Sequence, residues 1–176
     1  MPGPLPLARM ITVISGTARN DSNTLRVATL YQRLLTERGL PDVQLLSLQG
    51  INVWERSDEL KQIEDELLIP SERFVFIMPE YNGSFPGILK TMIDNTDIRS
   101  CWWAKKAMLT GLADGRAGNF RGLEHMTGIL QYMHMHVYWD KLPISRIKEE
   151  IDPDGRPLKE ITMCQINAQI EGFLQF

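Results

Sequence analysis

Two polar loops carry most of the side chains in this sequence that could do chemistry, and each follows a run of apolar residues. The first loop concentrates hydroxyl and amide groups around one arginine, in Ser15, Thr17, Arg19, Ser22, Asn23 and Thr24. Hydroxyls, unpaired backbone N–H groups and a guanidinium are the donors that hold phosphate in proteins. The loop therefore predicts an anion site. A helix cap at Ser22 or Asn23, with Arg19 in solvent, explains the same residues.

The second loop combines a carboxylate, an aromatic ring, an amide, a hydroxyl and a glycine. Its residues are Pro79, Glu80, Tyr81, Asn82, Gly83 and Ser84. Glycine lets the backbone approach a flat ligand closely, and the polar atoms stand where a buried strand is expected to end. An ordinary hydrophilic turn accounts for the same composition, so the loop alone leaves ligand contact and a turn both open.

A third loop, at residues 111–118, has three glycines among its eight residues: Gly111, Gly115 and Gly118. Glycines at this density mark unusual dihedral angles or close backbone approach. None of the loops has the GxxxxGK[ST] or GxGxxG pattern, so triphosphate and dinucleotide sites of those kinds are not indicated. The histidines lack the HExxH spacing of a helical zinc site. We interpret His125 and His134 as helix-surface residues and His136 as leading into a strand.

Strands and helices in alternation must position these loops. Apolar runs predict strands at residues 10–14, 43–48, 73–78, 107–110 and 137–138. Helical spacing of apolar residues predicts helices that begin near residue 25, at 57–69, from Pro86, at 119–133 and from about Pro157. This alternation is typical of an α/β fold with a doubly wound parallel sheet. In a sheet of order 2-1-3-4-5, the loops after strands one, three and four are adjacent at the ligand-binding edge.

Composition limits the remaining classes of function. The chain has 176 residues, 43% of them hydrophobic, and a net charge of −3 from 19 basic and 22 acidic residues. We expect a flexible lead-in at residues 1–8 and a single domain at 9–176. No basic block indicates nucleic acid, and no apolar run reaches the roughly 20 residues that span a bilayer. Cys101 and Cys164 lie far apart, which favours neither a disulfide framework nor zinc and fits a reducing cytoplasm.

The sequence resembles the flavodoxin-like NAD(P)H-dependent FMN reductase family, which includes quinone, azo-dye and chromate reductases. The most specific match is PEYNGS at residues 79–84, followed by Pro86-Gly-x-Leu-Lys90 and Ile93-Asp94. The first loop, Ser15-Gly-Thr-x-Arg19-x-x-Ser22-Asn-Thr24, is similar to the phosphate loop of the family. The third loop matches at Gly115 and Gly118. It departs at Leu112, Ala113, the acidic Asp114, and Asn119, where a glycine is usual.

The resemblance implies a three-layer flavodoxin-like fold, with a five-stranded parallel sheet of order 2-1-3-4-5 and helices on both faces. It also implies that FMN binds at the three loops. Its phosphate would be held by Ser15, Thr17, Arg19, Ser22, Asn23 and Thr24. Its ring would be bordered by Pro79, Glu80, Tyr81 and Asn82, and the cofactor site would be completed by Gly83, Ser84, Asp114, Gly115 and Gly118. Backbone N–H groups between residues 80 and 83 are candidates for stabilising negative charge on the ring.

The implied activity is that of an oxidoreductase that takes a hydride from NADPH or NADH. It would pass the electrons to a quinone, an azo compound, a metal oxyanion or free flavin, and no catalytic side chain or metal is assigned because the flavin carries the chemistry. Two alternatives remain: an electron carrier without nicotinamide oxidation, and a regulatory protein that has lost tight FMN binding. The resemblance also implies a homodimer or homotetramer. Trp102, Trp103 and Trp139 are candidate interface anchors or buried core residues.

Overall fold

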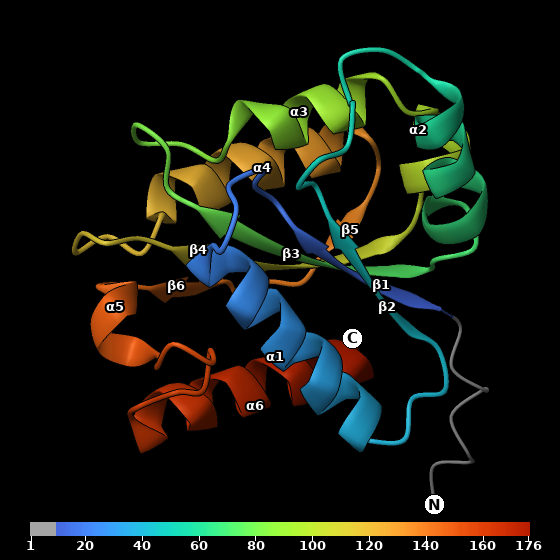
Figure 1. Cartoon of the computed structure of the whole chain (residues 1–176). Helices are drawn as coiled ribbons and strands as arrows, with labels where there is room; N and C mark the ends of the chain where they lie inside the picture. Colours follow the sequence, from blue (N-terminus) through green and yellow to red (C-terminus); the bar gives the residue numbers. More distant parts are fainter. Residues whose placement is uncertain (1–9) are drawn as a thin grey trace, which may run out of the picture.

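The computed structural model describes residues 10–176, and the expected lead-in at residues 1–8 lies outside them. The strands within these residues form one sheet (Figure 1), made of β1 (Ile11–Ser15), β2 (Val43–Ser47), β3 (Arg73–Pro79), β4 (Lys106–Leu112), β5 (His136–Val137) and β6 (Leu142–Ile144). The strands run parallel in the order β2-β1-β3-β4-β5. The predicted order is confirmed.

Strand β6 was not predicted, and it extends the sheet edge that β5 begins. β5 pairs with Lys106 and Ala107 at the start of β4, whereas β6 pairs with residues 110–112 at its end. The two short strands therefore act as one edge strand interrupted at residues 138–141. A proline in the middle of a three-residue run, Pro143, gives no strand signal, and proline is tolerated there because β6 lies at an edge.

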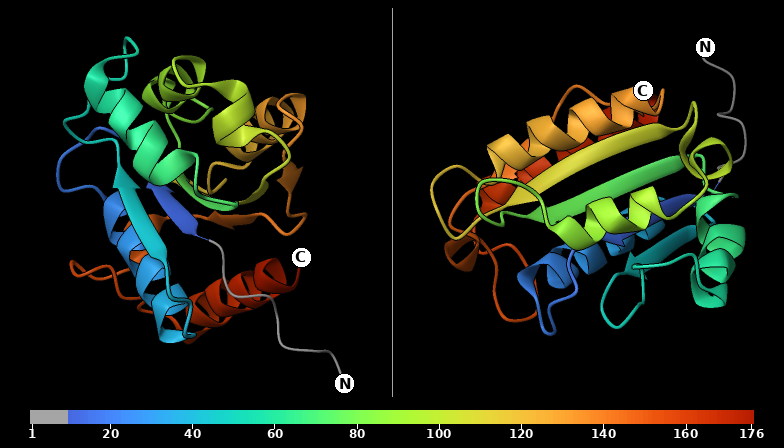
Figure 2. Two further views of the ribbon diagram at one scale, coloured as in Figure 1. Left: turned by 90° about the vertical axis from the view of Figure 1, so that its right-hand side faces the viewer. Right: turned by 90° about the horizontal axis from the view of Figure 1, so that it is seen from above.

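Helices cover both faces of the sheet (Figures 1 and 2). One face carries α2 (Asp58–Ile63), α3 (Gly87–Asp94) and α4 (Phe120–Tyr132), and the opposite face carries α1 (Asn23–Glu37) and α6 (Glu160–Gln175). The helix expected at 57–69 is α2 continued by a π-helical turn, η1 (Glu64–Leu68). Two short segments were not predicted: η2 (Ile98–Trp102) and α5 (Ile147–Glu150). Within residues 10–176, no helix combines the length and apolar character needed to cross a membrane.

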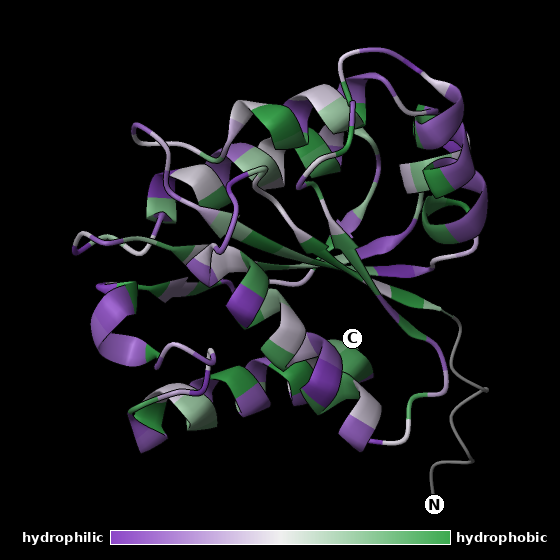
Figure 3. Cartoon of the chain, viewed as in Figure 1, coloured by the Kyte–Doolittle hydropathy of each residue, from purple (hydrophilic) through white to green (hydrophobic). Residues whose placement is uncertain are grey.

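The two cores lie on either side of β3, whose side chains alternate between them. Phe74 and Phe76 face the α3 and α4 side, while Val75 and Ile77 face α1 and α6, and all four are fully buried. Figure 3 shows the strands as the most hydrophobic part of the fold. Trp102 joins the first core at 0% exposure, with its ring centroid 5.0 Å from that of Phe74. Trp102 is therefore a core residue and not an interface anchor.

The two other tryptophans considered as interface anchors, Trp103 and Trp139, differ in their exposure. Trp139 is 75% exposed, whereas Trp103 is half-buried and stacks on His134 with ring centroids 3.9 Å apart. The prediction that His134 lies on a helix surface is wrong, because α4 ends at Tyr132 and His134 takes a left-handed backbone with φ of +59°. His125 does lie on the exposed surface of α4.

The sheet brings the three loops together. β1, β3 and β4 end at the same edge, where the register pairs Ser15 with Ile77 and Pro79 with Leu112. Gly111 and Leu112, expected in the third loop, belong to β4, so that loop begins at Ala113. The predicted adjacency of the three loops is confirmed.

Candidate functional site

A pocket of about 430 Å³ opens at the sheet edge where β1, β3 and β4 end. The three loops line it together with the start of α1 and the short helix α5. The lining residues are Thr17, Arg19, Asn20, Asp21, Ser22, Asn23, Thr24, Arg26, Pro79, Glu80, Tyr81, Leu112, Ala113, Asp114, Ile147 and Lys148. The carboxyl edge of a parallel sheet is the usual ligand-binding place in α/β folds.

The start of α1 presents backbone donors to this pocket. Ser22 caps the helix, and its hydroxyl accepts the N–H of Leu25 at 3.1 Å. The N–H groups of Asn23 and Thr24, in the first turn, have no acceptor among residues 10–176. Unpaired N–H groups and the positive end of the helix dipole favour an anion here. Capping by Ser22 and anion binding are therefore compatible.

Arg19 connects the first loop to the second. Its guanidinium carbon lies 4.2 Å from the ring centroid of Tyr81. The Tyr81 hydroxyl is 2.7 Å from the Oγ1 atom of Thr17, which also accepts the N–H of Arg19 at 3.3 Å. Within the described part of the chain, Arg19 forms no ion pair. Its N–H groups therefore remain available to an anion while the ring of Tyr81 holds the planar group in place.

The second loop is a tight turn. Tyr81 and Ser84 exchange backbone hydrogen bonds of 2.8 and 3.1 Å around Asn82 and Gly83, whose φ angles are +52° and +81°. Two consecutive left-handed residues with the sequence Asn-Gly are typical of a type I′ turn. Asn82 and Gly83 are therefore needed to form the turn, whether or not the loop also contacts a ligand.

This turn corrects the expectation about backbone donors. The N–H of Glu80 donates to the carbonyl of Leu112 at 2.7 Å, and that of Tyr81 donates to Ser84. Both groups are therefore already paired inside the protein. Of the N–H groups expected to face the ring, those of Asn82 and Gly83 have no acceptor in the described structure.

The third loop is anchored to α5 and β6. Asp114 forms an ion pair of 3.0 Å with Lys148 across the pocket. The carbonyl of Gly115 accepts the N–H of Arg146 at 3.0 Å. Gly118 has φ of +56°, and an added Cβ would lie 2.6 Å from the carbonyl carbon of Pro143. These two glycines shape the loop against its neighbours and do not line the pocket.

The predicted cofactor residues divide into two groups. Nine of them line the pocket: Thr17, Arg19, Ser22, Asn23, Thr24, Pro79, Glu80, Tyr81 and Asp114. The other six are not among its lining residues: Ser15, Asn82, Gly83, Ser84, Gly115 and Gly118. Ser15 is fully buried, and its hydroxyl has no hydrogen-bond partner among residues 10–176. The Ser84 hydroxyl instead lies 2.9 Å from Nδ1 of His125.

Sequence patterns missed several lining residues, of which Asp21, Arg26 and Lys148 are the charged ones. A helix as short as α5 shows no hydrophobic period, so Lys148 carried no signal. Arg26 lies one helical turn after the cap Ser22, and its guanidinium bonds Asn23 at 2.8 Å and Asp21 at 2.5 Å. A basic residue one turn after a predicted helix cap can face the same anion site, and this position could have indicated Arg26.

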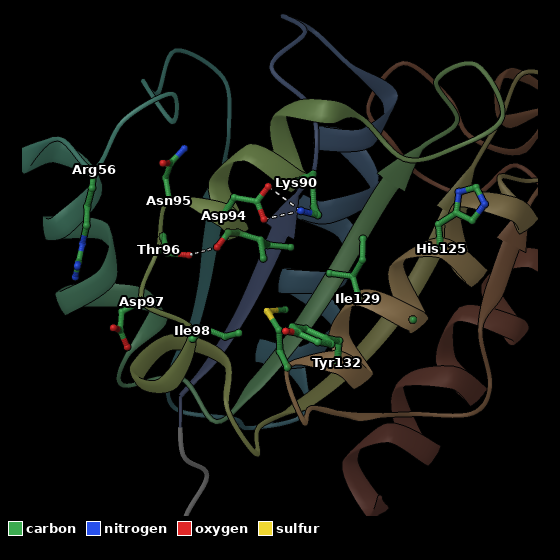
Figure 4. A pocket seen from close by; sticks show the side chains of 13 residues that line it. Arg56, Lys90, Asp94, Asn95, Thr96, Asp97, Ile98, His125, Ile129 and Tyr132 are labelled. Carbon is green, nitrogen blue, oxygen red and sulfur yellow. Dashed lines mark hydrogen bonds and ion pairs between the residues drawn. The ribbon is translucent and has the colours of Figure 1, made fainter.

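A larger groove of about 800 Å³ lies between α3 and α4 (Figure 4) and shares no residue with the first pocket. Its wall combines Ile93, Ile129 and Tyr132 with the ion pair of Lys90 and Asp94, 2.5 Å apart. Across residues 10–176, no three His, Cys, Asp or Glu side chains gather so as to hold a metal. Its apolar side chains and its ion pair make the groove an apolar surface with charged residues at its edge.

Arg56 stands at the rim of this groove because the buried Glu64 holds it. Its Nε and Nη2 atoms each lie 2.9 Å from Oε2 of Glu64, and this hydrogen bonding raises the pKa of Arg56. The other carboxylate oxygen accepts the Cys101 thiol at 3.6 Å. Burial and this carboxylate raise the pKa of Cys101 to about 12, so the thiol is protonated at neutral pH and is not a nucleophile.

Comparisons with known proteins place the chain among flavoenzymes. The family model described as NADPH-dependent FMN reductase matches residues 10–148. A 2-hydroxy-1,4-benzoquinone reductase from Burkholderia sp. is 23% identical over 163 residues, which cover 89% of each chain. A quinone reductase from Pseudomonas putida is 28% identical over 123 residues, which cover 65% of each chain.

Solved structures share the fold at lower identity. The flavoenzyme NAD(P)H:(acceptor) oxidoreductase FerB from Paracoccus denitrificans superposes with a TM-score of 0.72 and 21% identity, covering 96% of this chain and 98% of its own. An archaeal flavodoxin superposes with a TM-score of 0.62 and 17% identity, covering 96% and 98%. The three-layer flavodoxin-like architecture is thus confirmed.

Proposed function

Because the chain belongs to the NADPH-dependent FMN reductase family, and is therefore an oxidoreductase, we propose that the pocket at the ends of β1, β3 and β4 binds FMN. The bound flavin would take a hydride from NADPH or NADH. A quinone, an azo compound, a metal oxyanion or free flavin would then receive the electrons. The quinone reductases among its relatives support the first of these acceptors.

The observation that carries this proposal is the set of donors at the start of α1. Thr17, Ser22 and Arg19 line the pocket beside the unpaired N–H groups of Asn23 and Thr24. These donors are hydroxyl, amide and guanidinium groups, which is the chemistry that a phosphate requires. The residues present therefore fit the phosphate of FMN.

Flatter and less polar residues also line the pocket. Pro79 and Tyr81 come from the second loop, Leu112 from the end of β4, and Ala113 from the start of the third loop. They would border the ring system, for which FMN would supply hydride and electron transfer. The chain contributes binding, orientation and exclusion of water, and no protein side chain is required as a proton donor.

The cellular setting and the partners are part of the same proposal. We place the enzyme in the cytoplasm, where cysteines stay reduced, because Cys101 and Cys164 are both unpaired. Its substrates would be small molecules, and nucleic acid and membranes would not be partners.

A spectroscopic experiment tests the activity. The purified protein is mixed with FMN, desalted, and titrated with NADPH and with NADH in the absence of oxygen. We expect the retained flavin absorbance to bleach and to return on addition of a quinone. Retained flavin that neither nicotinamide bleaches would support an electron carrier and overturn the reductase proposal. A desalted protein without flavin would be tested again with excess FMN, and still no nicotinamide oxidation would count against the proposal.

Substitution of Lys148 by alanine is expected to raise the FMN dissociation constant about two- to fivefold, because an exposed ion pair contributes up to about 1 kcal/mol. Lys148 neutralises Asp114, and without it an unpaired carboxylate would face the phosphate. Quenching of FMN fluorescence gives the constant. The double variant with Asp114→Asn should recover the wild-type affinity, and Lys61→Ala, which breaks an ion pair on α2, should leave it unchanged. No recovery in the double variant would contradict this account.

We also propose that the chain forms a homodimer through the groove between α3 and α4. Two residues at this groove leave large apolar side chains in solvent, Tyr132 at 81% exposure and Ile98 at 38%. Lys90 and Asp94 on one wall give it charges of both signs. A surface of this kind can pair with a second copy around a two-fold axis, because the same patch then meets itself with complementary charges.

Substitution of Tyr132 by glutamate is expected to convert the dimer to a monomer, because it places a charge in an apolar contact. Light scattering coupled to size exclusion measures the mass. Trp139→Glu is the control, since Trp139 is also 75% exposed but lies outside the groove. A monomeric wild type, or dissociation by Trp139→Glu alone, would contradict the proposed interface.

A further inference from the structure

The side chain of Asn119 joins the second loop to the third. Its Nδ2 atom donates to the carbonyl oxygens of Met78 and Pro79 at 3.1 and 3.0 Å. These carbonyls belong to the last two residues of β3, while Asn119 immediately precedes α4. Asn119 is fully buried, and so the contact is shielded from water. One amide group thus uses both of its hydrogens on the strand end that leads into the pocket.

The backbone around Asn119 makes room for this contact. Gly118 and Asn119 are consecutive left-handed residues, with φ of +56° and +64°. A Cβ added at Gly122 would lie 2.1 Å from Oδ1 of Asn119, and one added at Gly111 would lie 2.4 Å from the carbonyl oxygen of Gly118. Glycines therefore stand at the two positions where a side chain would displace the asparagine.

Keeping an asparagine here has a cost. Its Oδ1 atom is buried and has no hydrogen-bond partner in the part of the chain that the structure describes, which is unfavourable for a polar atom. Its left-handed backbone is also unfavourable for any residue except glycine, although asparagine tolerates it best. Glycine would bear neither cost. The two hydrogen bonds to the end of β3 are what the asparagine adds.

We infer that Asn119 is a positioning residue that fixes the second loop against the third. The peptide between Pro79 and Glu80 is held at both polar groups, its carbonyl by Asn119 and its N–H by the carbonyl of Leu112 at 2.7 Å. The unpaired N–H groups of Asn82 and Gly83 follow directly in the same turn. Asn119 therefore sets where these donors stand. What they contact rests on the proposed function, whereas the contact of Asn119 with β3 does not.

Amide hydrogen exchange in the flavin-free protein, followed by NMR, tests the positioning role. Asn119→Gly keeps the left-handed backbone without strain, and Asn119→Asp keeps the shape but replaces the donor. We expect the Glu80 amide to exchange at least about tenfold faster in both variants, because its loop opens locally more often. The Gly16 amide, bonded to Ile77 on the other side of β3, should not change. Unchanged exchange at Glu80 in both variants would overturn the inference.

Asn95→Gly is the matched control. The amide of Asn95 also donates to two carbonyls, those of Val53 and Thr91, but at the end of α3. We expect this variant to lose stability without faster exchange at Glu80. Faster exchange at Glu80 in Asn95→Gly would show that this amide responds to overall stability and not to the Asn119 contact, and it would overturn the specific role of Asn119.

The spectrum of bound FMN connects the positioning role to the site. With FMN added, Asn119→Gly should shift the visible absorbance maxima of the bound flavin, whereas Asn95→Gly should keep the wild-type spectrum. Faster exchange at Glu80 in Asn119→Gly, together with an unchanged spectrum of bound flavin, would overturn the inference that Asn119 influences the flavin site. A wild type that binds no FMN would refute the proposed function alone, and the exchange rates would still decide the role of Asn119.

Discussion

Replacement of Arg19 by alanine is expected to raise the FMN dissociation constant about 10- to 150-fold, because a hydrogen bond to a charged group contributes roughly 1.5–3 kcal/mol. Arg19 lines the pocket, forms no ion pair in the described structure and is held over the ring of Tyr81. Its fork of donors suits a phosphate better than a point charge does. Titration of the protein into FMN, followed by flavin fluorescence, measures the constant.

Two further variants make this result specific. Arg19→Lys keeps the charge but not the planar fork, so we expect an affinity between those of the wild type and Arg19→Ala. Arg33→Ala removes another arginine, one that pairs with Glu37 at the far end of α1, and should leave the affinity unchanged. Wild-type affinity in Arg19→Ala would remove Arg19 from the phosphate site.

Replacement of Trp102 by alanine is expected to lower the free energy of unfolding by about 3–5 kcal/mol, as for other large-to-small core substitutions. Its ring packs at 5.0 Å from Phe74 and 6.1 Å from Phe76, and its indole N–H donates to Thr96 at 2.9 Å. The substitution would therefore leave a cavity and remove one hydrogen bond of the Thr96 hydroxyl, which keeps its bonds to the carbonyls of Met92 and Ile93. Denaturation by urea, monitored by circular dichroism, gives the change.

The matched control is Trp54→Ala, because Trp54 is 75% exposed. We expect that variant to change stability by less than about 0.5 kcal/mol. Trp102→Ala should also keep the oligomeric state of the wild type at temperatures where it is folded. A loss of the dimer without a loss of stability would return Trp102 to the interface.

Much of the fold was predictable because its signals are local. The apolar run of β3 and the loops that follow β1 and β3 each lie within about ten residues of sequence, and short-range patterns determine such elements. The same holds for Ser22, whose residue type predicts the cap that it forms. Parallel strands then place their carboxyl ends at one edge, which brought Arg19 next to Tyr81.

The rest depends on contacts between distant residues. Trp102 was ambiguous because packing, and not residue type, decides whether a tryptophan is buried. The N–H of Glu80 is paired only because Leu112 stands opposite it in the sheet. Lys148 reaches the pocket from α5, whose position depends on the edge strand β6. No short stretch of sequence contains these facts.

We expect the donors around Arg19 and the start of α1 to hold the phosphate of FMN. Calorimetric titration of the wild-type protein with FMN and with riboflavin tests it most directly, since the two ligands share the ring and differ in the phosphate. We expect FMN to bind at least about 100-fold more tightly, as loss of several charge-assisted hydrogen bonds would require. Equal affinity for the two ligands would contradict the account, because the pocket would then be recognising the ring alone.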